Sequence, residues 1–270
     1  MTSQAQKAHA FKALHEKDEV FIVANPWDAG SARLLQGLGF EALATTSAGF
    51  AQSLGRLDGE VSVDEKIDHC RALCAVTDIP ITADFENGFS DSPEEAAANL
   101  VKVAGAGVVG GSIEDYSGSG IYDFELAVER IAACAEAVSQ LSFPFMLTAR
   151  AENLLRGVND LDDTIKRLQA FEGAGADVLY APGLSNLDQV KQVLDSVHTP
   201  INVLFAFMPD VSLEQYAELG VRRISIGAAL ANLASGTILT ASKQMLSSGG
   251  FNWVKAAAPS AELKALLTSR

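Results

Sequence analysis

Cysteines, basic residues and long apolar runs are all scarce in this sequence. The three cysteines, Cys70, Cys74 and Cys134, provide neither an even disulfide framework nor the paired spacing of a zinc site. Residues 1–10 lack the apolar run of a signal peptide, and the apolar segment at residues 227–240 is interrupted by Asn, Ser and Gly, unlike a membrane span. We therefore expect a reduced, soluble protein of the cytoplasm that has no membrane partner.

Positive charge is scarce because 20 Lys and Arg residues stand against 34 Asp and Glu residues, which gives a formal net charge of −14. Nucleic-acid binding requires clustered Lys and Arg, and the sequence shows no such cluster. It also shows no Pro/Ser-rich linker, and 270 residues can bury one large core. We therefore predict a single domain over residues 1–270 with no nucleic-acid partner, and a locally held small anion remains compatible with the charge.

Short apolar segments alternate with segments of helical spacing eight times along the chain. The predicted strands are Glu19–Ala24, Ala42–Thr46, Ile79–Ala83, Val108–Ile113, Phe145–Thr148, Asp177–Tyr180, Ile201–Leu204 and Arg223–Ile226. The interval of 68 residues from Gly39 to Gly107 recurs from Gly107 to Gly175, which corresponds to about 34 residues per strand–helix unit. Eight such units predict an α/β protein of the (β/α)8 TIM-barrel type.

A doubly wound sheet is the alternative arrangement, but nothing in the sequence marks the reversal of strand order that it needs. Residues 105–110 match a dinucleotide-binding fingerprint by letter, yet a predicted helix precedes them and a strand follows them, which reverses that motif. We therefore favour the barrel, without a nicotinamide cofactor. Residues 228–270 are predicted to form a long C-terminal helical extension.

Two carboxylates stand at the end of the third predicted strand, in Ile81-Thr-Ala-Asp84-Phe-Glu86-Asn-Gly88-Phe89. Residues i and i+2 of a strand share a face, so Asp84 and Glu86 are expected to lean into one cavity. Two carboxylates that close favour a cation between them, and oxygen ligands suit Mg²⁺ or Mn²⁺. The alternative is an acidic loop that merely faces solvent.

An acid and an arginine end the next two strands, at the face of a barrel where activity resides. Glu114 follows the fourth strand and Arg150 the fifth. The Arg150 guanidinium can neutralise the neighbouring acids or grip a substrate carboxylate with two N–H groups, and we favour the grip. Glu152, two residues further on, is expected to hold Arg150 in place.

Other polar residues lie on the second and seventh strands. Thr46 and Ser47 end the second strand and begin a predicted long loop over residues 47–58, which closes with Asp58. Backbone N–H groups near Thr46 and Ser47 are suited to holding an oxyanion. Asn202 lies within the seventh strand.

Several of these motifs together resemble the isocitrate lyase / phosphoenolpyruvate mutase superfamily. They occur in its order as Asn25-Pro-Trp27-Asp28-Ala-Gly-Ser31-Ala, Thr46-Ser-Ala-Gly49-Phe through Asp58, Asp84-Phe-Glu86-Asn-Gly88-Phe89, Ser112-Ile-Glu114-Asp115 and Ala149-Arg150-Ala-Glu152. They span more than half of the chain. The resemblance implies a barrel enzyme that forms a homodimer or homotetramer and swaps its C-terminal helix between subunits.

The resemblance also implies roles for the site residues. Asp84 would hold Mg²⁺, with Mn²⁺ as a substitute, while Asp58, Glu86 and Glu114 would reach the metal mostly through water. The predicted catalytic residues are Asp58, Glu114 and Arg150, and the predicted substrate-binding residues are Trp27, Thr46, Ser47, Arg150 and Asn202. The chemistry of the superfamily makes or breaks a bond next to a 2-oxo or enolpyruvate group through a metal-stabilised enolate.

One departure from the superfamily bears on the reaction. Its lyases carry a Lys/Arg-Cys-Gly-His loop after the fourth strand, whereas residues 115–122 here read Asp-Tyr-Ser-Gly-Ser-Gly-Ile-Tyr. We therefore predict a Mg²⁺-dependent lyase that cleaves a carbon–carbon bond in a small 2-oxo or 2-hydroxy carboxylic acid, for example an oxaloacetate decarboxylase. The alternatives are a phosphoenolpyruvate mutase or phosphonopyruvate hydrolase type of carbon–phosphorus enzyme, and a barrel that only binds a dicarboxylate.

Overall fold

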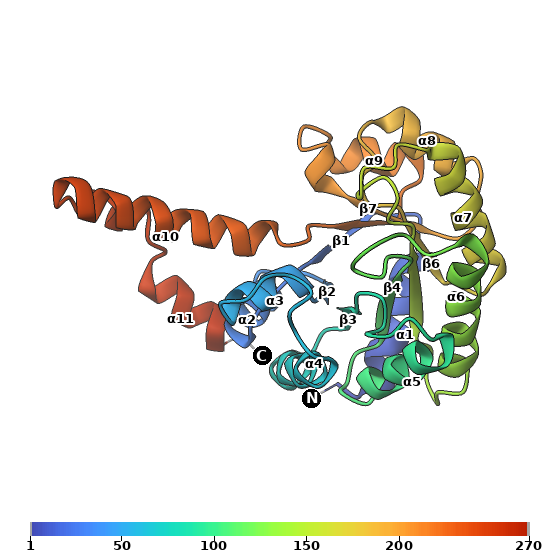
Figure 1. Ribbon diagram of the computed structural model, residues 1–270. Coiled ribbons are helices and arrows are strands. Elements are labelled where there is room, and N and C mark those ends of the chain that lie inside the picture. Colours follow the sequence, from blue (N-terminus) through green and yellow to red (C-terminus); the bar gives the residue numbers. More distant parts are fainter. Residues whose placement is uncertain (1, 269–270) are drawn as a thin grey trace.

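Eight parallel strands close into one barrel in the computed structural model, which describes residues 2–268 (Figure 1). The strand order around the barrel follows the sequence, and β8 pairs with β1. The strands are β1 Phe21–Ala24, β2 Ala42–Ala44, β3 Ile81–Asp84, β4 Gly110–Glu114, β5 Met146–Arg150, β6 Val178–Tyr180, β7 Ile201–Leu204 and β8 Arg223–Ser225. The (β/α)8 fold predicted from the eight repeated units is confirmed.

Helices surround the barrel, and α1 Gln4–Glu16 closes the end at which the strands begin. The others are α2 Ala29–Gly37, α3 Ser47–Ser53, α4 Val63–Val76, α5 Pro93–Ala104, α6 Phe124–Ser139, α7 Leu161–Gly173, α8 Leu187–Leu194, α9 Leu213–Leu219, α10 Ala229–Ser248 and α11 Ser260–Thr268, with 3₁₀ turns η1 Phe205–Phe207 and η2 Asn252–Ala256. Local sequence sets several of their starts. Reciprocal capping boxes begin α4 at Ser62 with Glu65 and α9 at Ser212 with Gln215.

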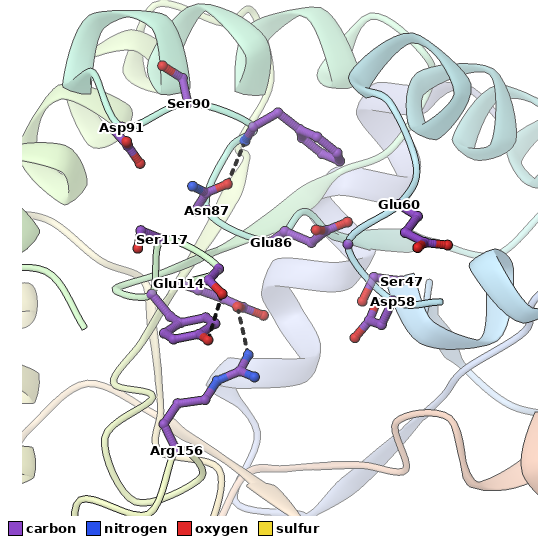
Figure 2. Close-up of a pocket in the computed structure, with 14 residues that line it drawn as sticks. Ser47, Asp58, Glu60, Glu86, Asn87, Ser90, Asp91, Glu114, Ser117 and Arg156 are labelled. Atoms are coloured by element: carbon purple, nitrogen blue, oxygen red, sulfur yellow. Dashed lines mark hydrogen bonds and ion pairs between the residues drawn. The ribbon is translucent and has the colours of Figure 1, made fainter. Parts of the chain in front are cut away.

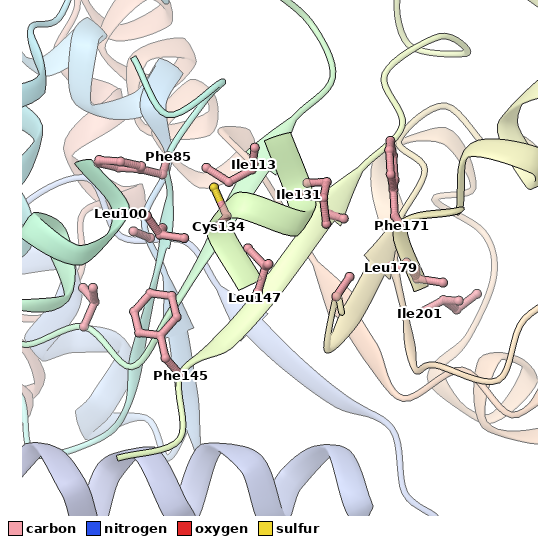
Figure 3. Packing of buried hydrophobic residues seen from close by; sticks show 14 of the residues in the cluster. Phe85, Leu100, Ile113, Ile131, Cys134, Phe145, Leu147, Phe171, Leu179 and Ile201 are labelled. Carbon is pink, nitrogen blue, oxygen red and sulfur yellow. The ribbon is translucent and has the colours of Figure 1, made fainter. Parts of the chain in front are cut away.

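Apolar side chains fill two separate volumes. The larger one lies between the strands and the outer helices, where Phe85, Leu100 and Leu147 pack with Cys134 (Figure 3). The smaller one fills the barrel interior near the starts of the strands, where Phe11 of α1 packs among strand residues such as Met146. Each such large side chain contributes roughly 1.5–3 kcal/mol relative to exposure. Packing at both levels fixes the strand ends that carry the polar residues.

One row of paired residues runs across the sheet from the last residue of β4 to the first residue of β8. The register aligns Glu114 with Arg150, Arg150 with Tyr180, Tyr180 with Asn202, and Asn202 with Arg223. Residues in one row of a sheet point to the same side. The fold therefore collects residues from β4 to β8 within one layer of the barrel interior.

Two local predictions were wrong. The expected loop over residues 47–58 contains the helix α3, because the Thr46 hydroxyl accepts a hydrogen bond from the Gly49 N–H (3.2 Å) and caps it. The third strand also ends one residue later than expected, at Asp84. Glu86 lies beyond it in a turn with φ 49°, so the two carboxylates are not alternate residues of one strand.

The chain ends in a helical arm that leaves the barrel. In Figure 1, α10 projects outward and α11 returns toward α2, with which it makes contact. Leu233, Ile238 and Leu246 are exposed on α10. The residues predicted as the extension, 228–270, include α10, η2 and α11, and the last two of them lie outside the described part. Within residues 2–268, no helix has the length and apolar character to cross a membrane.

Candidate active site

Asp84, the last residue of β3, is the most constrained carboxylate at the barrel mouth. Its Oδ1 accepts a hydrogen bond from Arg150 Nη1 (2.9 Å), and its Oδ2 accepts one from the Ser47 backbone N–H (2.8 Å). Its own N–H donates to the Thr45 hydroxyl (2.9 Å). The pKa of Asp84 is lowered although burial opposes this, because the Arg150 guanidinium and other donors favour its charged form.

Arg150 lies among three carboxylates rather than facing an open cavity. Its Nη1 is 2.9 Å from both Asp84 Oδ1 and Glu114 Oε1, and its Nε and Nη2 both lie 2.8 Å from Glu152 Oε1. Glu152 is fully buried. The predicted contact between Glu152 and Arg150 is therefore confirmed, and the guanidinium neutralises its neighbours in this state.

Glu86 is held in position by an unusual turn after β3. The turn has left-handed backbone angles at Glu86 (φ 49°) and Phe89 (φ 60°), which are uncommon for residues with a side chain. Arg130 of α6 stabilises it by donating to the carbonyls of Asn87 and Ser90, and Asn99 donates to the Gly88 carbonyl (3.0 Å). Surrounding structure thus maintains a strained turn, as is common at functional sites.

Two glutamates at the mouth have raised pKa values. Burial raises the pKa of Glu86 to about 7, and the charge on nearby Asp84 adds to this effect. Burial likewise raises the pKa of Glu114 to about 8, against the opposing effect of Arg150. In both cases burial is the main cause because it disfavours the charged form, and nearby carboxylates add to it.

An outer cavity of ≈ 650 Å³ stands over these residues (Figure 2). It is lined by Ser47, Asp58, Gly59, Glu60, Glu86, Asn87, Phe89, Ser90, Asp91, Glu114, Tyr116, Ser117, Gly118 and Arg156. Figure 2 shows Glu114 directed toward Arg156. Asp58 and Glu60 lie in the part of the view that also holds Ser47 and Glu86. The structure therefore brings the predicted residues Asp58, Glu86, Glu114 and Ser47 to one cavity.

Arg156 was missed by the sequence analysis. It follows β5 in a turn, stacks on the Tyr116 ring at 3.8 Å, and lies 3.6 Å from Glu114 and 3.3 Å from Glu152. No strand end or familiar spacing marks it in the sequence. Its position depends on the loop after β4, whose fold the sequence does not show directly.

That loop follows β4, the position that the resemblance assigns to the cysteine-bearing loop of the lyases. A bridge between Tyr116 and Ile121 shapes it, and Asp115 anchors it by accepting from the Glu152 N–H (2.7 Å) and pairing with Arg167 (3.1 Å). The loop presents hydroxyl groups and no thiol to the outer cavity. Cys134 is buried on α6.

The remaining predicted substrate-binding residues lie elsewhere. Asn202 is buried inside the barrel and lines a smaller inner cavity of ≈ 60 Å³, which Asp84 and Arg150 also line. Thr46 caps α3 and is buried. Trp27 packs near Gly49 of α3 and lines neither cavity.

The carboxylates at the mouth fit a hard cation that is bound mainly through water. Within residues 2–268, no three His, Cys, Asp or Glu side chains enclose a ready-made metal site. Arg150 instead lies between Asp84 and Glu114. Mg²⁺ commonly keeps several waters and takes one or two carboxylates from the protein, so Asp84 with more distant acids suffices in chemistry and number.

Comparisons with known proteins show which family this chain resembles. Residues 11–246 match the family model described as phosphoenolpyruvate phosphomutase. The 2-methylisocitrate lyase of Escherichia coli (strain K12) is 30% identical over 203 residues, which cover 71% of this chain and 67% of that protein. The oxaloacetate decarboxylase of Paraburkholderia xenovorans (strain LB400) is 27% identical over 221 residues, which cover 77% and 71% respectively.

A solved structure is similar over nearly the whole chain. It is the crystal structure of a protein from Burkholderia cenocepacia J2315, provisionally described as a lyase/mutase, with 48% identity and a TM-score of 0.95. The match covers 98% of this chain and 97% of that one. All eight strands, and every predicted site residue, fall within the residues that the family model matches.

Proposed function

The chain belongs to the phosphoenolpyruvate phosphomutase family of lyases and mutases, and within it we propose a Mg²⁺-dependent lyase that cleaves a carbon–carbon bond in a small 2-oxo or 2-hydroxy carboxylic acid. The most concrete form of this proposal is an oxaloacetate decarboxylase. One observation carries it: Asp84, Glu114 and Arg150 converge at the barrel mouth, beside a cavity whose loop lacks a thiol. A relative with oxaloacetate decarboxylase as its name supports the reaction type.

Asp84 is the residue proposed to hold Mg²⁺ or Mn²⁺ directly, with Asp58, Glu86 and Glu114 contributing through water. Glu86 and Asp58 both line the outer cavity, so they face the same volume. A bound cation would supply positive charge next to the oxygen on which negative charge develops. Its positive charge would also favour the charged forms of Glu86 and Glu114, which burial disfavours.

Arg150 is proposed to bind the substrate carboxylate once a cation shares its present partners. Its Nη1 is now divided between Asp84 and Glu114. A cation that attracts these two oxygens would leave N–H groups of Arg150 for the substrate, while buried Glu152 keeps the guanidinium in place. The Ser47 N–H and the start of α3 provide further donors on the same side.

The proposed reaction does not require a thiol. Decarboxylation leaves an enolate that needs a proton at carbon, and water or a hydroxyl-bearing group can deliver that proton. Tyr116 and Ser117 line the outer cavity and supply hydroxyl groups there. The loop at residues 115–122 is therefore compatible with decarboxylation, hydrolysis or retro-aldol cleavage.

A carbon–phosphorus enzyme is the second candidate, because the family model that matches is named for phosphoenolpyruvate phosphomutase. A panel with Mg²⁺ separates the two. We expect oxaloacetate to yield pyruvate and CO₂, with EDTA abolishing turnover, and Asp84→Asn protein as the inactive control. Release of phosphate from phosphonopyruvate, without turnover of oxaloacetate or any other 2-oxo acid, would reject the proposal in favour of the second candidate.

The arm suggests a homo-oligomer in addition. We propose that α10 packs against a second copy of the chain, since Ile238, Leu239 and Leu246 expose apolar surface that monomers rarely leave uncovered. Light scattering after size exclusion should give a dimer or tetramer, and Leu246→Glu should shift it toward monomer. A monomeric parent protein would contradict this part of the proposal.

A further inference from the structure

A second arginine lies inside the barrel, on the strand opposite the acidic residues. Arg223 of β8 is only 4% exposed and is in register with Asn202 of β7. It lines the inner cavity together with Arg150, Tyr180 and Ser225. None of the roles described above uses this side chain.

The hydrogen-bond partners of Arg223 are all uncharged. Its Nε donates to Asn202 Oδ1 (2.9 Å), its Nη2 donates to Thr148 Oγ1 (3.1 Å), and its Nη1 lies 3.5 Å from His15 Nε2. His15 Nδ1 lies 2.9 Å from the Phe11 carbonyl oxygen, which can only accept, so Nδ1 carries the proton. The other ring nitrogen, Nε2, therefore faces Arg223 as a neutral acceptor.

No carboxylate balances this guanidinium. Among residues 2–268, none of the ion pairs includes Arg223. The buried arginines Arg150 and Arg167 each pair with carboxylates, and buried Arg130 donates to two backbone carbonyls. Arginine cannot shed its charge in a protein, and an unpaired buried charge costs several kcal/mol. Burial accordingly lowers the pKa of Arg223 to about 10, which still leaves the side chain charged at neutral pH.

The inner cavity is suited to a small anion in both size and lining. Its ≈ 60 Å³ is about twice the ~30 Å³ that one water occupies, so it accommodates one carboxylate-sized group. Arg223 has five N–H donors and uses three in the contacts above, which leaves two for a ligand. Tyr180 and Ser225 add hydroxyl groups to the lining.

We propose that this inner cavity is an anion subsite in which Arg223 binds a carboxylate group or a free anion of similar size. The cavity is also lined by Asp84 and Arg150, so the subsite is continuous with the mouth of the barrel. The existence of the subsite does not depend on the proposed function. Its assignment to the second carboxylate of a dicarboxylic substrate does rest on that function.

Bromide provides a direct probe of the wild-type protein. Crystals of the full chain grown in bromide should show an anomalous peak in the inner cavity beside the Arg223 guanidinium. A map with bromide at other sites and none in this cavity would overturn the proposal. This measurement needs no variant, so it decides the question even if substitutions at this buried position prevent folding.

Formate tests the contribution of Arg223 in solution. Calorimetric titration should show formate binding to the wild type and at least about tenfold weaker binding to Arg223→Gln, or about 1.4 kcal/mol. The matched control is Arg222→Gln, because Arg222 is the neighbouring residue and pairs with Asp18. Circular dichroism checks that both variants fold. Equal formate affinity in wild type and folded Arg223→Gln would place the anion elsewhere and reject the assignment.

Competition distinguishes the two sources of the anion. With Mg²⁺ present, malate should displace formate from the wild type while lactate, which lacks the second carboxylate, should not. Displacement by neither acid would identify the occupant as a free small anion. If the 2-oxo acid panel shows no turnover while formate still binds through Arg223, the proposed function fails and the subsite stands.

Discussion

The two halves of the barrel differ in charge although one row of the sheet connects them. The acidic half, formed by β2 to β5 and the loops that follow, holds Asp84, Glu86 and Glu114 around Arg150. In the same row, the carboxylate-free half on β6 to β8 continues as Tyr180, Asn202 and Arg223. One half is thus suited to a cation and the other to an anion.

This difference separates two tasks that an enolate-forming enzyme must perform. A metal requires negative side chains close together, and these would repel a carboxylate substrate unless a cation or arginine intervened. The Arg223 guanidinium, on the opposite side of the barrel, would fix the orientation of a bound substrate as well as its position. Substitutions in the acidic half should therefore change the affinity for the metal, whereas substitutions in the other half should change the affinity for the anion.

The largest effect is expected from Asp84→Asn, which removes the carboxylate proposed as the direct metal ligand. Mg²⁺ affinity should fall by more than ~100-fold, the upper end of losses seen for outer-shell partners, and turnover should disappear. Calorimetry with Mg²⁺ measures this directly, with the exposed Asp188→Asn as control. Glu114→Gln should weaken Mg²⁺ less, since its contribution passes through water. Unchanged Mg²⁺ affinity in Asp84→Asn would show that Asp84 is not the metal ligand and would contradict the assignment of the cation site to the acidic half.

A smaller loss is expected for Arg150→Lys. Lysine keeps the positive charge between Asp84 and Glu114, but a point charge cannot reproduce the two parallel N–H groups of a guanidinium. We expect kcat/KM to fall by about 10–100-fold, or ~1.4–2.7 kcal/mol. Arg71→Lys on the outer surface of α4 is the matched control. Kinetics like those of the parent would show that Arg150 contributes charge alone.

A buried histidine belongs to each half, and both histidines should make stability depend on pH. Burial lowers the pKa of His15, beside Arg223, and of His69, which stacks on Phe50, to about 3. Above pH 6.5 both histidines are neutral in the folded and in the unfolded chain. Between pH 6.5 and 3 the unfolded chain takes up a proton that the folded chain refuses, so stability falls by about 1.4 kcal/mol per unit for each histidine.

Urea unfolding at pH 7.5 and 5.5 measures this dependence. We expect the parent to lose stability at the lower pH, and His15→Gln and His69→Gln each to lose less by about 1 kcal/mol. His9→Gln, on the exposed face of α1, controls for the substitution. Equal losses in the parent and in both buried variants would show that these rings accept protons without unfolding.

The sequence predicted the acidic half well and the other half poorly, for a physical reason. Carboxylates at strand ends stand out against apolar strands, so Asp84, Glu114 and Arg150 were identified from order alone. Arg223 is expected from the sequence only as the first residue of the eighth strand. Its inward direction depends on the register with Asn202 and on the α1 residues below, which are tertiary facts.

The turn after β3 is a second place where tertiary contacts, and not the local sequence pattern, determine the position of a site residue. Alternation along a strand predicted that Glu86 and Asp84 would lean into one cavity, whereas Glu86 lines the outer cavity and Asp84 lines the inner one. Glu86 reaches the outer cavity through a left-handed turn held by Arg130, a residue more than forty positions away. Local periodicity did not predict this separation, since a contact so distant in sequence leaves no local pattern.

The smallest effect is expected from the cysteines, which lie outside both halves. Burial raises the pKa of Cys70 to about 11 and those of Cys74 and Cys134 to about 12, so each remains a thiol at neutral pH and is a poor base. Replacing all three with Ala should cost a few kcal/mol of stability at most through small cavities. At a temperature where the variant is folded, kcat should stay within about tenfold of the parent, a change of ~1.4 kcal/mol in the barrier. Circular dichroism provides the folding control. A folded triple variant whose kcat falls by several orders of magnitude would show that a thiol moves the proton, and would align the reaction with that of the cysteine-dependent lyases.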